Sequence, residues 1–362
     1  MSTFAYELAE VLRAQEQATP AHPDGPYSLP WYLVIGDPGT GRTTAVKALN
    51  MSWPRGDGPL QMTAPQQLCT YWMPEKAVFI EPEQQVLGPS RTPIYLQQLC
   101  EELKEKRPRE PLDGMLLVIN AGQVAGWPED SVERFSRVLR GYLVEVCRYL
   151  DSDIPIYVMV SAYDTIWGFG DAFQWTAERA DEEPWGFKLP VDLKPSETGE
   201  HIIKALDALN ARIESYCFAK VSTDGPINAR VRAFQHLSEA RALIDRLGEL
   251  MKIISLENAF ERAPWVRAMV IGSGMPGTGG KLRYKVPMFA SYGLQPAAQS
   301  GCTTPGGMPM HALLDNVLIP EKDIVPTQVR WRDDKLILIC AGLGILLWLA
   351  MVIYFIVSTL IA

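Results

Sequence analysis

A glycine-rich segment near the N-terminus has the residue types and spacing best suited to chemistry. It reads Gly36-Asp-Pro-Gly-Thr-Gly-Arg-Thr43, follows a short apolar run and precedes a helical pattern. This is the frame G-x-x-x-x-G-K-(S/T) of a phosphate-binding loop (P-loop), whose amides hold phosphates at a helix N-terminus. In such a loop the final hydroxyl binds Mg²⁺, and the residue before it holds the outer phosphates.

Arg42 takes the place of the usual lysine in this frame. It keeps the charge, but its planar guanidinium is wider and stiffer than an ammonium group, so the exchange is not conservative. The candidate residues for binding ATP or GTP are Gly36, Gly39, Gly41, Arg42, Thr43 and Thr44. The alternative is a tight turn between strand and helix that keeps its glycines for backbone geometry and binds nothing.

A working P-loop protein also needs an acidic residue after a second strand to help hold Mg²⁺. The apolar run 77–80 is followed by Glu81-Pro-Glu-Gln84. Glu81 offers a longer carboxylate than the usual aspartate, Pro82 has no N–H group, and Gln84 stands where a switch glycine is expected. Thr43 and Glu81 are therefore the metal ligands only if a magnesium nucleotide binds, and the alternative is a solvated acidic turn.

Two further segments were weighed as parts of a nucleotide site. Asp164 ends the segment Ser161-Ala-Tyr-Asp164, where guanine-specific proteins carry (N/T)-K-x-D, and it can accept hydrogen bonds from a guanine ring. Ala162 supplies neither the charge nor the packing of the lysine in that motif. A second glycine cluster, 272–277, matches G-x-G-x-x-G, but it contains Pro276 and lacks a following helix, which indicates a loop.

The elements that would position these residues are strands alternating with helices. Short apolar runs suit strands buried on both faces of a parallel sheet; they lie at 31–35, 77–80, 115–119, 156–160 and 268–271. Helical patterns occupy 4–17, 43–49, 95–106 and 131–150, and two longer ones occupy 200–220 and 228–254. We therefore predict an α/β fold: a P-loop NTPase-like, mostly parallel sheet with a helical appendage.

The C-terminal residues 336–362 predict one transmembrane helix, because this run of 27 residues contains no charge. A helix of that length is roughly 40 Å long, against about 30 Å for the bilayer core. Arg330, Arg332 and Lys335 precede the run, so the positive-inside rule places the N-terminal body in the cytoplasm. The first 30 residues carry several charges and show no signal-peptide pattern.

Composition limits the classes of function. The net charge is −8, with 34 basic and 42 acidic residues, which argues against a nucleic-acid-binding protein. The six cysteines and four histidines lack the spacing of a metal site. The predicted parts are an N-terminal helix and linker (1–30), the P-loop domain (31–190), a helical extension with a return strand (191–275), an irregular juxtamembrane segment (276–335) and the transmembrane helix (336–362).

The segment 31–44 resembles the P-loop opening of the cytoplasmic domain of the IcmF/TssM family, inner-membrane proteins of type VI secretion systems. Further similar stretches follow in family order at 69–72, 77–80, 111–118, 154–158, 184–190, 265–274 and 312–320. The sequence departs from the family where Glu81-Pro-Glu-Gln84 replaces Asp-Thr-Ala-Gly and where Ala162 replaces a lysine. Typical members also have two membrane helices before this domain and a large periplasmic region after the third.

The resemblance implies a bacterial inner-membrane protein with a single membrane pass here, working in a hetero-oligomer with a TssL-like partner and the cytoplasmic baseplate. Two hypotheses follow. In the first, the chain is a non-catalytic scaffold with a degenerate nucleotide fold, and no catalytic residue is assigned. In the second, it is an ATP- or GTP-dependent switch in which Thr43 binds Mg²⁺, Arg42 holds the β- and γ-phosphates, and Glu81 orients a metal-bound water.

Overall fold

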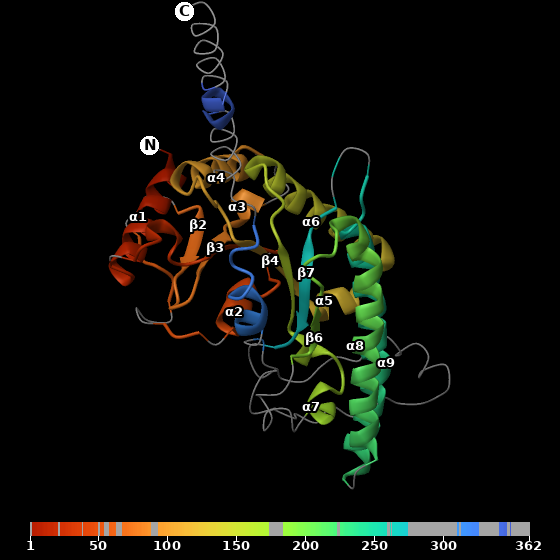
Figure 1. The fold of residues 1–362 in the computed structure, drawn as a ribbon. Helices are drawn as coiled ribbons and strands as arrows, with labels where there is room; N and C mark the ends of the chain where they lie inside the picture. The colour runs from red at the N-terminus through yellow and green to blue at the C-terminus, as the bar shows by residue number, and fades with distance from the viewer. Residues whose placement is uncertain are drawn as a thin grey trace, which may run out of the picture.

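The computed structural model describes residues 2–20, 22–37, 39–49, 51–53, 58–62, 67–87, 93–173, 184–222, 225–258, 261, 263–273, 310, 313–325, 340–345 and 348. A single sheet runs through this part of the chain, with helices packed around it (Figure 1). The strand order is β2-β3-β1-β4-β5-β7-β6. Within it, β3, β1, β4, β5 and β7 are parallel, and the edge strands β2 and β6 are antiparallel to their neighbours.

All five apolar runs form strands, so the prediction of a mostly parallel α/β sheet is confirmed. The strands are β1 (Trp31–Ile35), β2 (Cys69–Trp72), β3 (Val78–Pro82), β4 (Gly114–Asn120), β5 (Ile156–Ser161), β6 (Gly186–Lys188) and β7 (Val266–Ile271). The edge strands β2 and β6 are not among the predicted apolar runs. Each is short, and β6 is only partly buried, so neither carries the continuous apolar run that marks a central strand.

The helices follow the predicted patterns, with three short additions at α3, α5 and α7. They are α1 (Thr3–Ala18), α2 (Arg42–Lys47), α3 (Gln84–Leu87), α4 (Pro93–Lys106), α5 (Ala121–Gly126), α6 (Glu129–Leu150), α7 (Phe169–Ala172), α8 (Thr198–Val221) and α9 (Ile227–Ile254). The pair α8–α9 forms a long antiparallel hairpin beside the sheet (Figure 1). Because β7 follows α9 and pairs with β5, this hairpin is inserted between strands of one sheet.

Alternation along the strands divides the core into two layers. On one face, side chains such as Leu33 and Val158 pack with α1, α4, α6 and the α8–α9 hairpin. On the other face, Tyr32 and Val118 pack with α2 and with a segment near the C-terminus. That segment, residues 313–325, covers this face of the sheet with the side chains of Leu313, Leu314, Val317 and Leu318. Among the described residues, no long helix packs on this face.

A buried ion pair fixes residues 313–325 to the sheet. Glu321 accepts hydrogen bonds from Nε and Nη2 of Arg267 on β7 at 3.1 and 2.7 Å. The hydroxyl of Tyr157 donates to the same carboxylate at 3.2 Å, and Lys188 lies 3.1 Å from it. Each charge in this group therefore has a partner in an environment where an unpaired charge would be costly.

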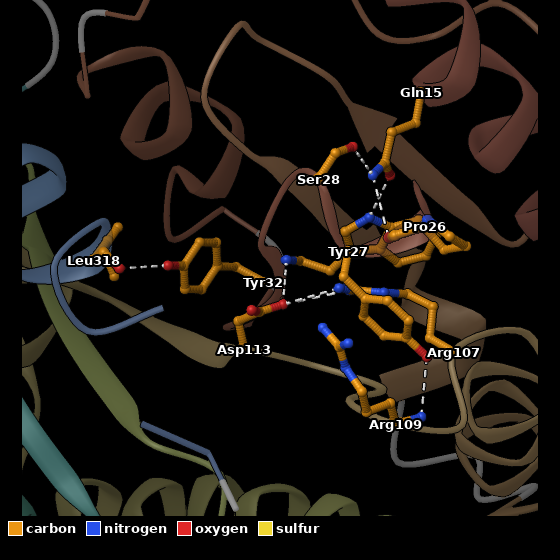
Figure 2. A network of polar contacts seen from close by, with 10 residues as sticks. Gln15, Pro26, Tyr27, Ser28, Tyr32, Arg107, Arg109, Asp113 and Leu318 are labelled. Atoms are coloured by element: carbon orange, nitrogen blue, oxygen red, sulfur yellow. Dashed lines mark hydrogen bonds and ion pairs between the residues drawn. The ribbon is translucent and has the colours of Figure 1, made fainter. Parts of the chain in front are cut away.

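A second buried polar network supports the start of β1 (Figure 2). The carboxylate of Asp113 accepts the Trp31 N–H at 2.7 Å and two Arg107 N–H groups at 3.3 and 3.4 Å. The Arg107 guanidinium lies over the rings of Tyr27 and Trp31. Gln15 of α1 accepts a hydrogen bond from the Trp31 indole at 2.9 Å. The N-terminal helix is thus joined by polar contacts to the strand that precedes the glycine-rich loop.

Among the residues that the structure describes, no helix combines the length and apolarity needed to cross a bilayer. The predicted transmembrane run, 336–362, lies outside the described residues except for 340–345 and 348, which are helical. The predicted transmembrane helix therefore stays a prediction.

Candidate functional site

The glycine-rich loop lies at the carboxyl edge of the sheet, directly after β1. The chain places β3 on one side of β1 and β4 on the other. In open α/β sheets, ligands bind at this kind of reversal in strand order, beyond the carboxyl ends of the strands. The fold therefore puts the predicted P-loop where a nucleotide site belongs.

The backbone of the loop explains its glycines. A Cβ atom on Gly36 would lie 2.7 Å from the Val118 carbonyl oxygen and 2.8 Å from the Thr40 hydroxyl oxygen, closer than side chains tolerate. Gly39 and Gly41 have φ angles of +82° and +80°, which glycine adopts without strain. All three are needed to shape the loop whether or not a ligand binds.

Hydrogen bonds within the protein also hold the loop in shape. The Thr40 N–H and hydroxyl both donate to the Asp37 carbonyl, at 3.1 and 2.8 Å. The Thr40 carbonyl in turn accepts a hydrogen bond of 2.6 Å from the hydroxyl of Ser161, at the end of β5. Ser161 begins the segment 161–164 whose Asp164 was considered as a guanine acceptor, and its own hydroxyl supports the loop.

The side chain of Arg42 is directed to the end of β3. Its Nη1 donates to the Pro82 carbonyl at 2.8 Å, and its Nε lies 3.4 Å from Oε1 of Glu81. Both side chains of the ion pair are about seven-eighths buried. The cation that would hold the outer phosphates is thus already paired inside the protein.

The carboxylate of Glu81 contacts three donor side chains, those of Arg42, Thr43 and Trp72. We call these four residues the Glu81 cluster. The Thr43 hydroxyl donates to the two carboxylate oxygens at 3.1 and 3.3 Å, and the Trp72 indole N–H donates to Oε2 at 2.9 Å. The two predicted metal ligands, Thr43 and Glu81, are therefore brought together. Glu81 is buried, whereas Glu83 and Gln84 are exposed, so the alternative interpretation of a solvated acidic turn does not apply to Glu81 itself.

Two members of this region were not singled out in the sequence. Trp72 reaches Glu81 because β2 runs antiparallel to β3, a pairing that its local sequence does not reveal. Asp37 lies within the loop, and burial raises the pKa of its carboxyl while the nearby charge of Arg42 opposes that shift. The carboxylate of Asp37 would compete with a phosphate for Arg42. The sequence could have indicated this, because Asp37 lies inside the glycine motif that begins at Gly36.

Asp164 lies at the same sheet edge, in a short helical turn after β5. Its carboxylate accepts a hydrogen bond from the hydroxyl of Ser273. Burial raises the pKa of Asp164, and this hydrogen bond acts against the shift. Ala162 takes a left-handed conformation with φ of +55°. The carboxylate that could accept hydrogen bonds from a guanine ring is thus bonded to Ser273 of a neighbouring loop. The glycine cluster of that loop continues outside the described residues.

Thr44 lies in the first turn of α2, partly buried behind the loop, and it makes no polar side-chain contact with the Glu81 cluster. Among the described residues there is also no group of three or more histidine, cysteine or acidic side chains placed to hold a metal ion. The arrangement is therefore a glycine loop at the start of α2 in which the cation of Arg42 and the hydroxyl of Thr43 contact one buried carboxylate.

Sequence comparisons identify similar proteins. A family model described as the IcmF-related N-terminal domain matches residues 92–346, beginning after the loop and β3. The chain is 24% identical over 262 residues to the type VI secretion system component TssM1 of Pseudomonas aeruginosa. That alignment covers 68% of this chain and 23% of the relative, so the chain spans less than a quarter of that protein's length.

Comparison with solved structures gives weak likenesses. One is to a variant of the protein SsGBP, with 15% identity and a TM-score of 0.23 over 45% of this chain and 47% of that one. Another is to a GTP-binding protein of Sulfolobus solfataricus in complex with GDP, with 14% identity and a TM-score of 0.23 over 44% and 41%. Scores of this size carry no argument about ligand or mechanism.

Proposed function

The chain belongs to the family of IcmF-related proteins, and on that premise we propose that it is a structural component of a type VI secretion membrane complex. The relationship to TssM1, itself described as a component of that system, supports this assignment. In the proposed role the chain is a non-catalytic scaffold. It docks a TssL-like inner-membrane partner and the cytoplasmic baseplate through a P-loop domain that no longer works on nucleotide.

The Glu81 cluster is the observation that carries the non-catalytic role. A magnesium nucleotide needs the cation of Arg42 and the hydroxyl of Thr43, and both are bonded to Glu81. Hydrogen bonds to charged groups contribute about 1.5–3 kcal/mol each. Releasing Arg42 would also leave a carboxylate and a guanidinium without their partner in a mostly buried place. The protein's own carboxylate thus competes for the groups that a nucleotide would use.

The end of β3 supports the same conclusion. Pro82 has no N–H group to offer to a γ-phosphate, and its carbonyl already accepts from Arg42. Gln84, where a switch glycine was expected, is the first residue of α3. Residues 82–84, which would respond to a γ-phosphate in a working site, therefore lead into the first turn of α3 and contact Arg42 instead.

A nucleotide-dependent switch is the second candidate function, and the intact loop favours it. Gly36, Gly39 and Gly41 keep the conformation of the loop, and Thr43 faces Glu81 as a metal-binding pair would. In this version ATP or GTP with Mg²⁺ displaces the internal contacts. Thr43 then binds the metal, and Asp164 reads a guanine ring after leaving Ser273.

Membrane attachment is part of the proposal. Residues 336–362 form the single transmembrane helix in the inner membrane, and the P-loop body (31–190) with its helical extension (191–275) stands in the cytoplasm. Residues 313–325, which lie within the juxtamembrane region (276–335), are packed on the sheet, so this region has a fixed point on the body before the anchor. A force on the membrane anchor would be transmitted to the sheet through the ion pair of Arg267 and Glu321.

Secretion in cells tests the proposed function. Deletion of the gene should abolish release of proteins by the type VI secretion system, and the intact chain should restore it. The variant Thr43→Ala should restore release to the same level, because the scaffold does not need a metal ligand. Unchanged release after deletion would contradict the assignment to the secretion complex. Failure of a folded Thr43→Ala chain would favour the switch.

A further inference from the structure

Large apolar side chains are exposed together at the free end of the α8–α9 hairpin. Phe218 on α8 and Ile227, Val231 and Phe234 on α9 are 51%, 66%, 38% and 53% exposed. We call these four residues the hairpin-tip patch. The three on α9 are spaced i, i+4 and i+7 and so share one face of the helix, and the ring of Phe234 meets that of Phe218 at 6.4 Å between centroids. Contiguous exposed apolar surface of this kind marks interaction sites.

The surface between the helices continues from the patch as a strip of small residues. Ala211 is seven residues before Phe218 on α8, and Ser238 is four residues after Phe234 on α9, so both continue the stripes of the patch. Beyond them, Asp207 and Arg241 form an ion pair across the hairpin at 3.6 Å. The outer face thus runs from bulky apolar residues through Ala211 and Ser238 to a charged pair.

The inner side of the same hairpin is firmly held. Arg232 makes hydrogen bonds of 2.7 and 3.0 Å to Asp171 of α7. His236 is fully buried and bonds the Tyr163 hydroxyl at 2.9 Å and the Trp167 carbonyl at 2.7 Å. The exposed aromatic residues therefore stand on a fixed support, which lowers the entropy cost of binding a partner.

Charge and position select the kind of partner. The chain has a net charge of −8, whereas residues 211–237 contain four basic and two acidic residues. Of the basic residues, Arg232 is buried in its ion pair with Asp171, and Lys220 and Arg230 are the partly exposed ones next to the patch in the sequence. A symmetric contact between two hairpin tips would bring these basic regions together, which disfavours a second copy. The tip also lies at the opposite end of the molecule from the helix at 340–345 (Figure 1), away from the proposed membrane anchor, which disfavours a lipid surface.

We propose that the hairpin-tip patch docks a cytoplasmic protein partner through an amphipathic helix with large apolar residues on one face and acidic residues beside it. The proposal rests on the proposed scaffold function and names the surface that the scaffold uses. The two phenylalanines fill the apolar face of the partner helix, as aromatic residues do at the centre of interfaces. Lys220 and Arg230 face its acidic flank.

Binding measurements with the full chain in detergent test the surface. Each purified cytoplasmic component of the same organism's type VI system is titrated against the wild-type chain and against Phe218→Ser/Phe234→Ser. The matched control is Ile94→Ser, which changes a residue of α4 that is 52% exposed. One acidic component should bind wild type and control equally and the double variant at least tenfold more weakly. Its binding should also weaken as NaCl rises from about 50 to about 300 mM.

A double variant that binds every component within twofold of wild type would overturn the proposal, as would binding of no component by the wild-type chain. Circular dichroism must show the variants folded, which exposed positions allow. In cells, Phe234→p-benzoylphenylalanine should crosslink to the same acidic component, and crosslinks only to a second copy or to lipid would also overturn it. The deletion test of secretion is independent of the patch, so it separates failure of this surface from failure of the scaffold function.

Discussion

The hydroxyl oxygen of Thr43, in the first turn of α2, lies 3.1 Å from a carboxylate oxygen of Glu81, near the end of β3. In a nucleotide-bound P-loop these positions serve one Mg²⁺ ion. Here the two residues bind each other, and Arg42 shares the same carboxylate. The two residues predicted to hold a metal ion thus form an internal contact within the protein.

The Glu81 cluster should stabilise the fold. Glu81→Gln removes the negative charge that pairs with Arg42, and we predict a loss of about 1–3 kcal/mol in the free energy of unfolding. Urea denaturation followed by circular dichroism measures it. Glu83→Gln is the matched control, because that neighbouring side chain is exposed and should change stability by less than about 0.5 kcal/mol. Equal stability of the two variants would contradict the structural role of Glu81.

Two of the ion pairs that residues 313–325 make with the rest of the body, Arg267–Glu321 and Lys76–Asp315, should differ strongly in energy. Glu321→Gln leaves the buried Arg267 guanidinium without its counter-charge, and we predict a loss of about 3–5 kcal/mol. Asp315→Asn removes a half-exposed pair with Lys76 and should cost at most about 1 kcal/mol. Limited proteolysis should cut near residue 325 faster in Glu321→Gln alone. Similar protease rates in the two variants would argue against a fixed C-terminal segment.

Stability should fall as pH rises through the neutral range. Burial raises the pKa of Glu110 from 4.5 to about 8, with a smaller contribution from Asp113. A carboxyl with a raised pKa in the folded state stabilises the fold below its unfolded pKa and loses that contribution as pH rises through the folded pKa. We therefore predict a decline in unfolding free energy between about pH 4.5 and pH 8.

The matched variant for this pH dependence is Glu110→Gln, which stays neutral at every pH. Its unfolding free energy should vary less than that of wild type over the same range, and it should exceed wild type near pH 8. The Oε1 atom of Glu110 accepts no hydrogen bond from the residues that the structure describes, so the amide costs little there. A wild-type pH profile retained in Glu110→Gln would assign the effect to other groups.

Gly36 should tolerate no side chain. Gly36→Ala places a methyl group 2.7 Å from the Val118 carbonyl, and we predict a loss of about 2–4 kcal/mol or failure to fold, because backbone must shift. Gly199→Ala is the control, since its Cβ would be 3.5 Å from the nearest side chain at the start of α8. It should be neutral or slightly stabilising. Thermal unfolding of both variants distinguishes these results.

Much of the fold could be predicted from the sequence because its central strands are continuous apolar runs and its long helices have clear periodicity. The edge strand β2 could not, since its pairing with β3 depends on tertiary contacts. The position of Trp72 beside Glu81 follows from that pairing and was missed with it. The apolar spacing of Leu314, Val317 and Leu318 was a usable signal for the docked segment, but the surrounding sequence is rich in proline and glycine and suggested irregular structure.

The candidate site was predicted in part. The glycine frame, Thr43 and Glu81 were identified by spacing, and the structure brings them together. Their mutual hydrogen bonds could not be predicted, because side-chain direction at the end of β3 depends on the packing of Trp72 and Arg42. Asp164 was placed at the correct sheet edge, but its contact with Ser273 joins residues more than a hundred positions apart, which local sequence patterns do not encode.

Isothermal titration calorimetry of the full chain in detergent, with ATP and with GTP in the presence of Mg²⁺, tests the scaffold account most directly. Phosphate release is followed in the same samples, and Thr43→Ala is titrated in parallel. The account predicts no binding heat up to about 1 mM nucleotide, which corresponds to less than about 4 kcal/mol of binding free energy, and no phosphate release. Micromolar binding that disappears in Thr43→Ala, accompanied by turnover, would contradict the scaffold role and establish the switch.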